Sequence, residues 1–129
     1  MQINQKDTFD IAVTLPAQGR AANANGAAID LQNYNDMTMV FLPVGWMDGT
    51  HVYTMQDSPD GITWTNVAAA QLNGTPPTLA AAGDANTITR VGYMGPQRYV
   101  RAVLTVSGAT AGAVVGVHAV RMNARKLPK

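Results

Sequence analysis

The clearest pattern in the chain is an alternation of apolar and polar residues in its last third. Over residues 98–107, every second residue is apolar and falls on one side of an extended strand: Val100, Ala102, Leu104 and Val106. We expect this side to face a core. Runs at 87–94 and 113–122 predict two further strands, and turns containing glycine or proline separate the three.

The first third of the chain carries weaker strand patterns. Residues 8–15 predict a first strand that ends at Pro16, because proline cannot donate to a strand ladder. The segment 19–28 is rich in small residues and contains an Asn-Gly turn signal at 25–26. Residues 37–44 are apolar on both faces, which predicts a central strand or one lying against a neighbour.

A hairpin is predicted in the middle of the chain. Strand patterns at 52–56 and 62–67 flank the sequence DSPDG at 57–61, in which proline suits the second position of a type I turn and glycine its end. Residues 68–72 fit one helical turn. Residues 73–86 predict a long loop, of the kind that is functional or mobile in compact domains.

Together these elements predict an all-β protein. About eight short strands, with turns about every ten residues, suit a two-sheet β-sandwich similar to a jelly roll. The length of 129 residues matches one domain. We therefore expect a single domain over 1–129, with a short N-terminal arm at 1–7 and a basic C-terminal tail at 123–129.

Charge is scarce and unevenly distributed along the chain. Only 13% of the residues are charged, against 47% hydrophobic, and there is no glutamate. Residues 1–84 carry all eight acidic and two basic side chains, a formal charge of −6, whereas residues 85–129 carry +7. A weakly charged surface suits a protein held in an assembly, and opposed charge blocks suit contact between copies or with a large partner. Strands from both blocks can nevertheless interleave in one sheet.

Several classes of protein are disfavoured by what the sequence lacks. Without cysteine there are no disulfides, thiolate metal sites or cysteine nucleophiles. No stretch approaches the roughly 20 apolar residues that cross a bilayer, and the start lacks the basic and apolar regions of a signal peptide. We expect a soluble protein, made in the cytoplasm, with no membrane partner.

Catalytic and cofactor-binding residues are not predicted. The two serines, Ser58 and Ser107, lie beside turns and outside any nucleophile motif. His118 shares a face with apolar residues and is expected to be buried and hydrogen-bonded, whereas His51 follows a turn and is expected to be solvated. The glycines form no phosphate-binding loop.

A metal site is also not predicted. Asp48, Asp57 and Asp60 match no calcium-loop spacing, and an aspartate at a turn ordinarily caps its own backbone. Any pair of the eight aspartates could meet as two carboxylates for glycoside hydrolysis, but the sequence favours no pair.

Aromatic and basic residues supply the candidate contacts. The aromatic residues at or near strands could form a sugar-stacking platform, but are expected in the core or at a subunit interface: Trp46, Tyr53, Trp64, Tyr93 and Tyr99. Basic residues with interleaved tyrosines predict an interface with a partner protein or another subunit: Arg90, Tyr93, Arg98, Tyr99, Arg101, Arg121, Arg125 and Lys126. An acidic protein surface is the favoured partner, solvated strand edges are the alternative, and direct contact with nucleic acid is not expected.

Four segments, taken in order, resemble small structural proteins of tailed bacteriophages. They are NGAAIDLQ at 25–32, QDSPDGITW at 56–64, RVGYMGPQRYVR at 90–101 and GAVVGVH at 112–118. Each is a strand-and-turn motif, so the resemblance lies in their order and spacing across most of the chain. The C-terminal end, MNARKLPK after Arg121, is longer and more basic than the short tail of that group.

The resemblance implies a capsid decoration, or cement, protein. Members of that group are similar β-sandwich or jelly-roll modules that bind the outside of the head without catalysis. It implies the major capsid protein as partner, a dimer or trimer of this chain, and a location on the capsid exterior. Two alternatives stay open: a carbohydrate-binding module displayed on a virion, using Trp46 or Trp64, and a tail or connector component.

Overall fold

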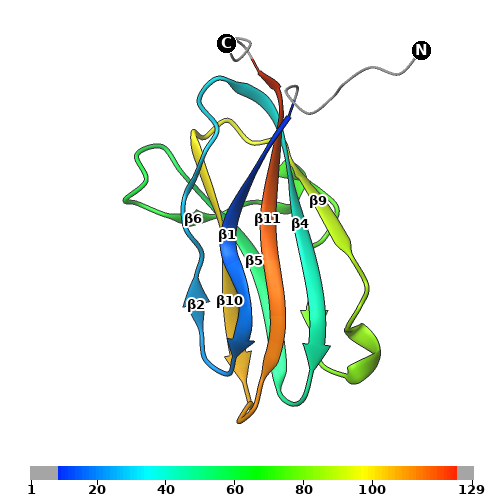
Figure 1. Cartoon of the computed structure of the whole chain (residues 1–129). Coiled ribbons are helices and arrows are strands. Elements are labelled where there is room, and N and C mark those ends of the chain that lie inside the picture. Colours follow the sequence, from blue (N-terminus) through cyan, green and yellow to red (C-terminus); the bar gives the residue numbers. More distant parts are fainter. Residues whose placement is uncertain (1–8, 125–129) are drawn as a thin grey trace, which may run out of the picture.

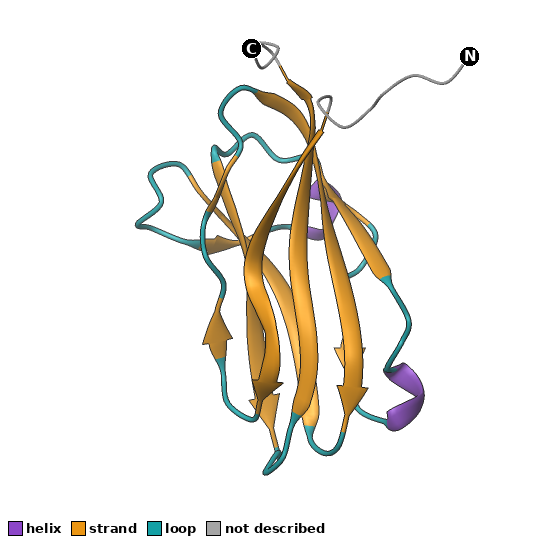
Figure 2. Ribbon diagram, viewed as in Figure 1, coloured by secondary structure: helices purple, strands orange, loops and turns teal. Residues whose placement is uncertain are grey.

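The computed structural model describes residues 9–124 and shows two antiparallel sheets packed face to face, so the predicted all-β sandwich is confirmed (Figure 1). These residues contain eleven strands, six with five or more residues and five with only two (Figure 2). The five-stranded sheet has, in spatial order, β1 (Phe9–Arg20), β11 (Ala113–Ala124), β4 (Tyr34–Trp46), β9 (Thr89–Tyr93) and β7 (Leu72–Asn73).

The second sheet is built around two long strands. β10 (Tyr99–Ser107) and β5 (Thr50–Ser58) pair along their whole length, from Tyr99 opposite Ser58 to Ser107 opposite Thr50. Two-residue strands cover their outer edges: β2 (Ala24–Asn25) and β3 (Ile29–Asp30) pair with β10, and β6 (Thr65–Asn66) and β8 (Thr78–Leu79) pair with β5. The sandwich shares two packed antiparallel sheets with a jelly roll, but its long strands divide four to two.

The core lies between the two sheets and follows the predicted alternation. Val100, Ala102 and Leu104 are fully buried on the inner side of β10, as predicted, and Val106 is partly buried against them. Strand β4 occupies the middle of the five-stranded sheet, also as predicted, and its inner side chains include Met39 and Phe41. The ring of Phe41 meets that of Tyr53 edge to face, with 5.7 Å between centroids.

The predicted end of the first strand at Pro16 is wrong, because β1 continues to Arg20. Proline is tolerated there since β1 lies at the edge of its sheet and pairs only with β11 within residues 9–124. The register against β11 shifts between Val13 and Leu15 and again between Leu15 and Gln18. These bulges accommodate the proline without ending the strand.

The Asn-Gly pair at 25–26 is not a hairpin turn but the place where the chain crosses between β1 and β10. The Gly26 amide donates to the carbonyl of Ala102 at 2.7 Å, and the Ala27 amide donates to the carbonyl of Thr14 at 2.7 Å. A Cβ on Gly26 would collide with the Thr14 hydroxyl. Glycine is therefore required here by close approach of three chain segments.

The predicted hairpin and helical turn are both confirmed. β5 and β6 pair antiparallel, with Gln56 opposite Asn66, although the second strand is shorter than predicted. The Ser58 hydroxyl accepts the amide of Gly61 at 2.8 Å and donates to Asp60 at 2.9 Å, which fixes the turn between them. A single 3₁₀ turn, η1, occupies Ala69–Gln71.

The long loop at 73–86 is interrupted by two short elements. Strand β8 and a second 3₁₀ turn, η2 (Ala82–Asp84), lie within it, and the Asp84 carboxylate accepts the amides of Ala80 and Ala81. None of the helices in residues 9–124 is long and apolar enough to span a membrane. The predicted arm at 1–7 lies outside the described residues, and the predicted tail begins within β11, whose backbone extends to Ala124.

Candidate functional site

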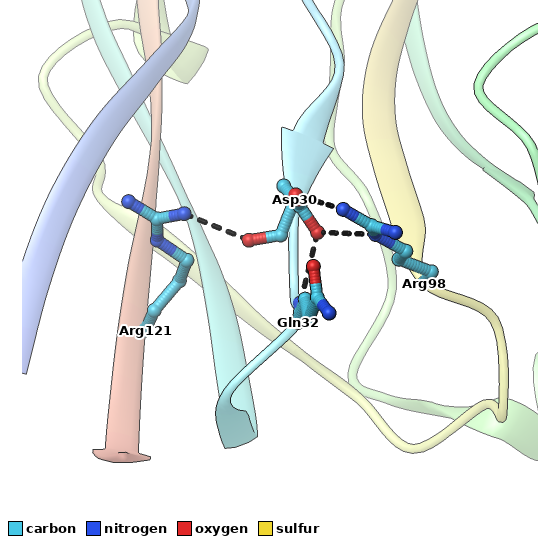
Figure 3. Close-up of polar contacts among 4 residues, drawn as sticks. All are labelled: Asp30, Gln32, Arg98 and Arg121. Atoms are coloured by element: carbon cyan, nitrogen blue, oxygen red, sulfur yellow. Dashed lines mark hydrogen bonds and ion pairs between the residues drawn. The ribbon is translucent and has the colours of Figure 1, made fainter. Parts of the chain in front are cut away.

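Arg98, a predicted contact residue, forms an ion pair with Asp30 (Figure 3). Its Nε donates to Oδ1 at 2.9 Å and its Nη2 to Oδ2 at 2.8 Å, a two-pronged contact. The Gln32 amide adds a third bond to the same carboxylate. The hydrogen bonds from Arg98, which have the largest effect, and from the backbone amide of Gln32 hold the pKa of Asp30 below its usual range. Arg98 is therefore neutralised within its own chain.

Arg121 is the second arginine held by the acidic part of the chain. Its Nη1 donates to the backbone carbonyl of Asp30 at 2.7 Å, and its Nε and Nη2 both donate to the Asp10 carboxylate (Figure 3 shows the first of these bonds). The guanidinium also lies over the Tyr34 ring, 4.8 Å from its centroid. Because Arg121 belongs to β11 and Asp30 to β3, this contact joins the two sheets at one end of the sandwich.

The opposed charge blocks of the sequence therefore meet in space. Asp30 and Asp10 come from the acidic block, and Arg98 and Arg121 from the basic block. Two of the seven basic side chains of the basic block are thus paired with aspartates of the acidic block. The structure thus removes part of the predicted attraction between the basic block and an acidic partner.

Arg101 and Tyr99 lie on the outer side of β10. The Arg101 guanidinium donates twice to the Gln56 side-chain oxygen, at 3.0 and 2.7 Å, and covers the Trp64 ring at 4.4 Å. Burial lowers its pKa. The Arg98 guanidinium lies over the Tyr99 ring, 4.9 Å from its centroid. Both residues remain partly exposed and contribute to one polar outer surface.

Tyr93 lies in the core, one of its two predicted places, and not at the predicted interface, because it is only 7% exposed. Its hydroxyl donates to Oδ2 of the buried Asp57 at 2.7 Å and accepts the Gln97 amide at 3.1 Å. Desolvation, and then the bond to Asp57, raises the pKa of Tyr93. Tyr93 is a core residue, whereas Arg90 projects from β9 and is exposed. Arg125 and Lys126 lie outside the described residues.

The two histidine predictions are both corrected. His51 is not a solvated loop residue but fully buried in β5, where its Nε2 lies 3.0 Å from the carbonyl of Asp48. A carbonyl only accepts, so Nε2 carries a hydrogen, and Nδ1 is buried without a hydrogen-bond partner within residues 9–124. His118 is half-buried on the outer side of β11, and its Nδ1 is also buried without a hydrogen-bond partner among these residues.

Two of the three aspartates cap backbone turns, but only Asp60 caps its own turn as predicted. Asp60 accepts the amides of Ile62 and Thr63 in its own turn, as predicted. Asp48 instead caps the 108–112 turn, accepting amides that include Gly112 at 2.6 Å, and these bonds lower its pKa. No three histidine, aspartate or glutamate side chains in residues 9–124 are grouped so as to hold a metal ion.

The two tryptophans do not form a shared stacking platform. The Trp46 indole N–H donates to the carbonyl of Gly49 at 2.8 Å, and its ring packs on the core. The Trp64 ring is covered by Arg101. A hollow of about 470 Å³ opens at one end of the sandwich between residues 31–37 and 93–98, and neither tryptophan lines it.

Within residues 9–124, exposed apolar side chains gather on the outer side of the five-stranded sheet. Apolar side chains from β1, β11 and β4 meet there in register: Ile11 lies opposite Val120, and Val13 opposite His118, which faces Val40. Ile11 is 57% exposed and Val13 45%. We call this surface the apolar outer face. It consists of Phe9, Ile11, Val13, Val40, Leu42, Val114, Val120 and Met122, with Thr38, Gly116 and His118 among them.

The outer side of the six-stranded sheet is different in character. Its residues are mostly amides, hydroxyls and the arginine: Asn25, Thr54, Gln56, Asn66, Thr78, Arg101 and Thr105, with Val52 and Val103 among them. One outer side of the sandwich is therefore polar and the other apolar. The sequence did indicate the apolar side. Residues 37–44 are apolar on both faces of their strand, and His118 shares its face with apolar residues.

Comparisons with known proteins place the chain in no family. No protein-family profile matches it, and no curated protein matches it. Among solved structures, the chain is similar to one described as "Bacillus endospore appendages form a novel family of disulfide-linked pili", with 16% identity, a TM-score of 0.48 and coverage of 96% of both chains. At that level the likeness carries no argument about function.

Proposed function

We propose that this chain is a structural virion protein that binds the outer surface of a bacteriophage capsid and stabilises the shell, without catalysis. The observation that carries the proposal is the apolar outer face. A monomeric soluble protein rarely keeps a contiguous apolar surface across three strands exposed to water, whereas a subunit of an assembly uses one for contact.

The remaining surface supports the same role. The bond from Arg121 to the carbonyl of Asp30 and the bond from Tyr93 to Asp57 tie the two sheets to each other. The ion pairs of Asp30 and Asp10 join neighbouring segments within each sheet. Such cross-links make a rigid body, which loses little conformational entropy when it docks. Weak contacts repeated around a capsid lattice then sum to strong retention, and binding to the assembled shell stabilises it by mass action.

Within residues 9–124, the main residues proposed to contact the major capsid protein are exposed and form no ion pair with an acidic residue of the same chain. Arg90 is exposed on β9, and the exposed loop at 73–86 lies beside it through the pairing of Asn73 with Gly92. Arg125 and Lys126 supply further positive charge. Arg98 and Arg121 make a smaller contribution because each already has an acidic partner.

Binding to heads tests this function. Purified protein is mixed with heads that lack it, and co-sedimentation measures the copies bound per head. We expect saturation at a fixed stoichiometry set by the lattice. A protein that remains in the supernatant with both unexpanded and expanded heads contradicts the proposal.

Two variants refine the same assay. Arg90→Gln removes an exposed charge that forms no ion pair within residues 9–124, and deletion of 125–129 removes three basic residues beyond the end of β11. Both are expected to weaken binding and make it less sensitive to salt. Arg98→Gln is the matched control, because this arginine is already neutralised by Asp30, and a loss of binding as large as that of Arg90→Gln would contradict the assignment.

A further inference from the structure

We propose that the apolar outer face is covered by a second copy of this chain, so that two five-stranded sheets pack face to face across a two-fold axis. The inference rests on the proposed function in one respect, since both treat the face as an assembly surface. It goes further by naming the occupant. The capsid is then contacted by a dimer, through parts of the molecule outside this face.

The shape of the face suits a copy of itself. Two twisted antiparallel sheets pack with their strands about 30° apart and about 10 Å between backbones, and this is how the two sheets of a sandwich meet. Strands β1, β11 and β4 make a continuous surface of that kind, and Arg90 of β9 lies beyond its margin. A two-fold axis brings identical surfaces together, so no second type of surface is needed.

The charges around the face also permit self-association. The charged side chains on this side of the sheet within residues 9–124 are Asp36 in β4 and Arg90 in β9, which have opposite signs. Both lie toward the β4–β9 side, away from Ile11 and Val13 in β1. The face is thus neutral in sum, and two copies bring no excess of like charge together.

The area of the face sets the strength of the dimer. Three strands spaced about 4.8 Å apart, each with about nine residues at a rise of about 3.3 Å, give a face of roughly 400 Å² per copy. Two copies therefore bury roughly 800 Å², the size of a weak interface. We expect a dimer that dissociates in the micromolar range in solution and is reinforced on a lattice.

Pairing through strand edges is a poorer route to a dimer. β1 is a long edge strand, but its register is broken by two bulges and it contains Pro16. Bulges and proline disfavour the addition of another strand at an edge. The second sheet is covered at its edges by two-residue strands. Contact through the apolar face is therefore preferred over extension of a sheet.

Sedimentation velocity over a concentration series tests the inference with a matched pair of variants. Val13→Asp places a carboxylate within the face, and Val52→Asp places one on the outer side of the other sheet, where the valine is 36% exposed. Wild type and Val52→Asp are expected to form dimers, and Val13→Asp to associate at least about tenfold more weakly. Circular dichroism confirms that each variant retains the fold.

The outcomes separate this inference from the proposed function. A wild-type protein that stays monomeric throughout the series, or equal weakening by both variants, overturns the inference. If monomeric protein still binds heads and Val13→Asp abolishes that binding, the capsid covers the face, so the inference fails and the function stands. A third outcome is that wild-type and Val52→Asp protein form dimers, Val13→Asp protein does not, and none of the three proteins binds heads. The inference then stands and the proposed function fails.

Discussion

The hydroxyl of Tyr93 in β9 donates a 2.7 Å hydrogen bond to the carboxylate of Asp57 in β5, which links the two sheets through the core. Asp57 is 7% exposed and Tyr93 equally so. The tyrosine therefore supplies a partner to a carboxylate that has little access to water. Removal of that partner leaves a buried acceptor unsatisfied.

Tyr93→Phe is accordingly expected to destabilise the protein by about 1–3 kcal/mol, measured by chemical denaturation near neutral pH. Tyr53→Phe is the matched control, since Tyr53 is also buried but its hydroxyl has no hydrogen-bond partner within residues 9–124. It should cost less. Equal losses from both variants would show that the bond to Asp57 contributes nothing specific.

Alkaline pH should destabilise the fold through the same two tyrosines. Burial raises the pKa of Tyr53 to about 12, and burial together with Asp57 raises that of Tyr93. The unfolded chain ionises first, near pH 10, so stability is complete below about pH 10 and falls as the pH rises above it. Denaturation curves at increasing pH should show this fall, with a shallower slope in Tyr53→Phe. A flat profile to about pH 12 would contradict it.

Acid should weaken the cap that Asp48 makes on the 108–112 turn. Hydrogen bonds from backbone amides lower the pKa of Asp48 in the folded protein, and the bond from Gly112 has the largest effect. Its stabilising effect is present above the unfolded value, near pH 3.9, and is lost as the pH falls through the lower folded value. Asp48→Asn should lower Tm at neutral pH, and its difference from wild type should narrow below about pH 4. A constant difference at every pH would rule out this ionisation.

The crossing at Gly26 should not tolerate a larger residue. In Gly26→Ala the new methyl group meets the Thr14 hydroxyl and lies 2.7 Å from the carbonyl of Ala102. Backbone must move to admit it, at a cost of about 1–3 kcal/mol. Gly19→Ala is the control, because an added Cβ there meets nothing within 4 Å. Similar Tm values for both variants would show that the crossing is not tightly packed.

Much of this fold was predictable because period-two alternation and turn residues act locally. The inner side of β10, the central position of β4 and the hairpin at 57–61 all follow from neighbouring residues. The boundary at Pro16 failed because an edge position and a bulge remove the penalty on proline. Neither property can be read before the strand order is known.

The candidate contacts were harder to predict because they depend on distant residues. Arg98 and Asp30 are 68 positions apart, and Arg121 and Asp10 are 111 apart. Their pairing, and the burial of Tyr93 beside Asp57, follow from the assembled sandwich alone. Phe9, Ile11 and Val13 likewise become part of one apolar face only once β1 pairs with β11.

Resistance of heads to heat most directly tests the claim that this chain stabilises a capsid. Heads lacking the protein are incubated with increasing amounts of it, and the temperature of DNA release is followed with a DNA-binding dye. We expect the release temperature to rise and then level off when the bound copies reach their fixed number per head. An unchanged release temperature on heads saturated with bound protein would contradict the account.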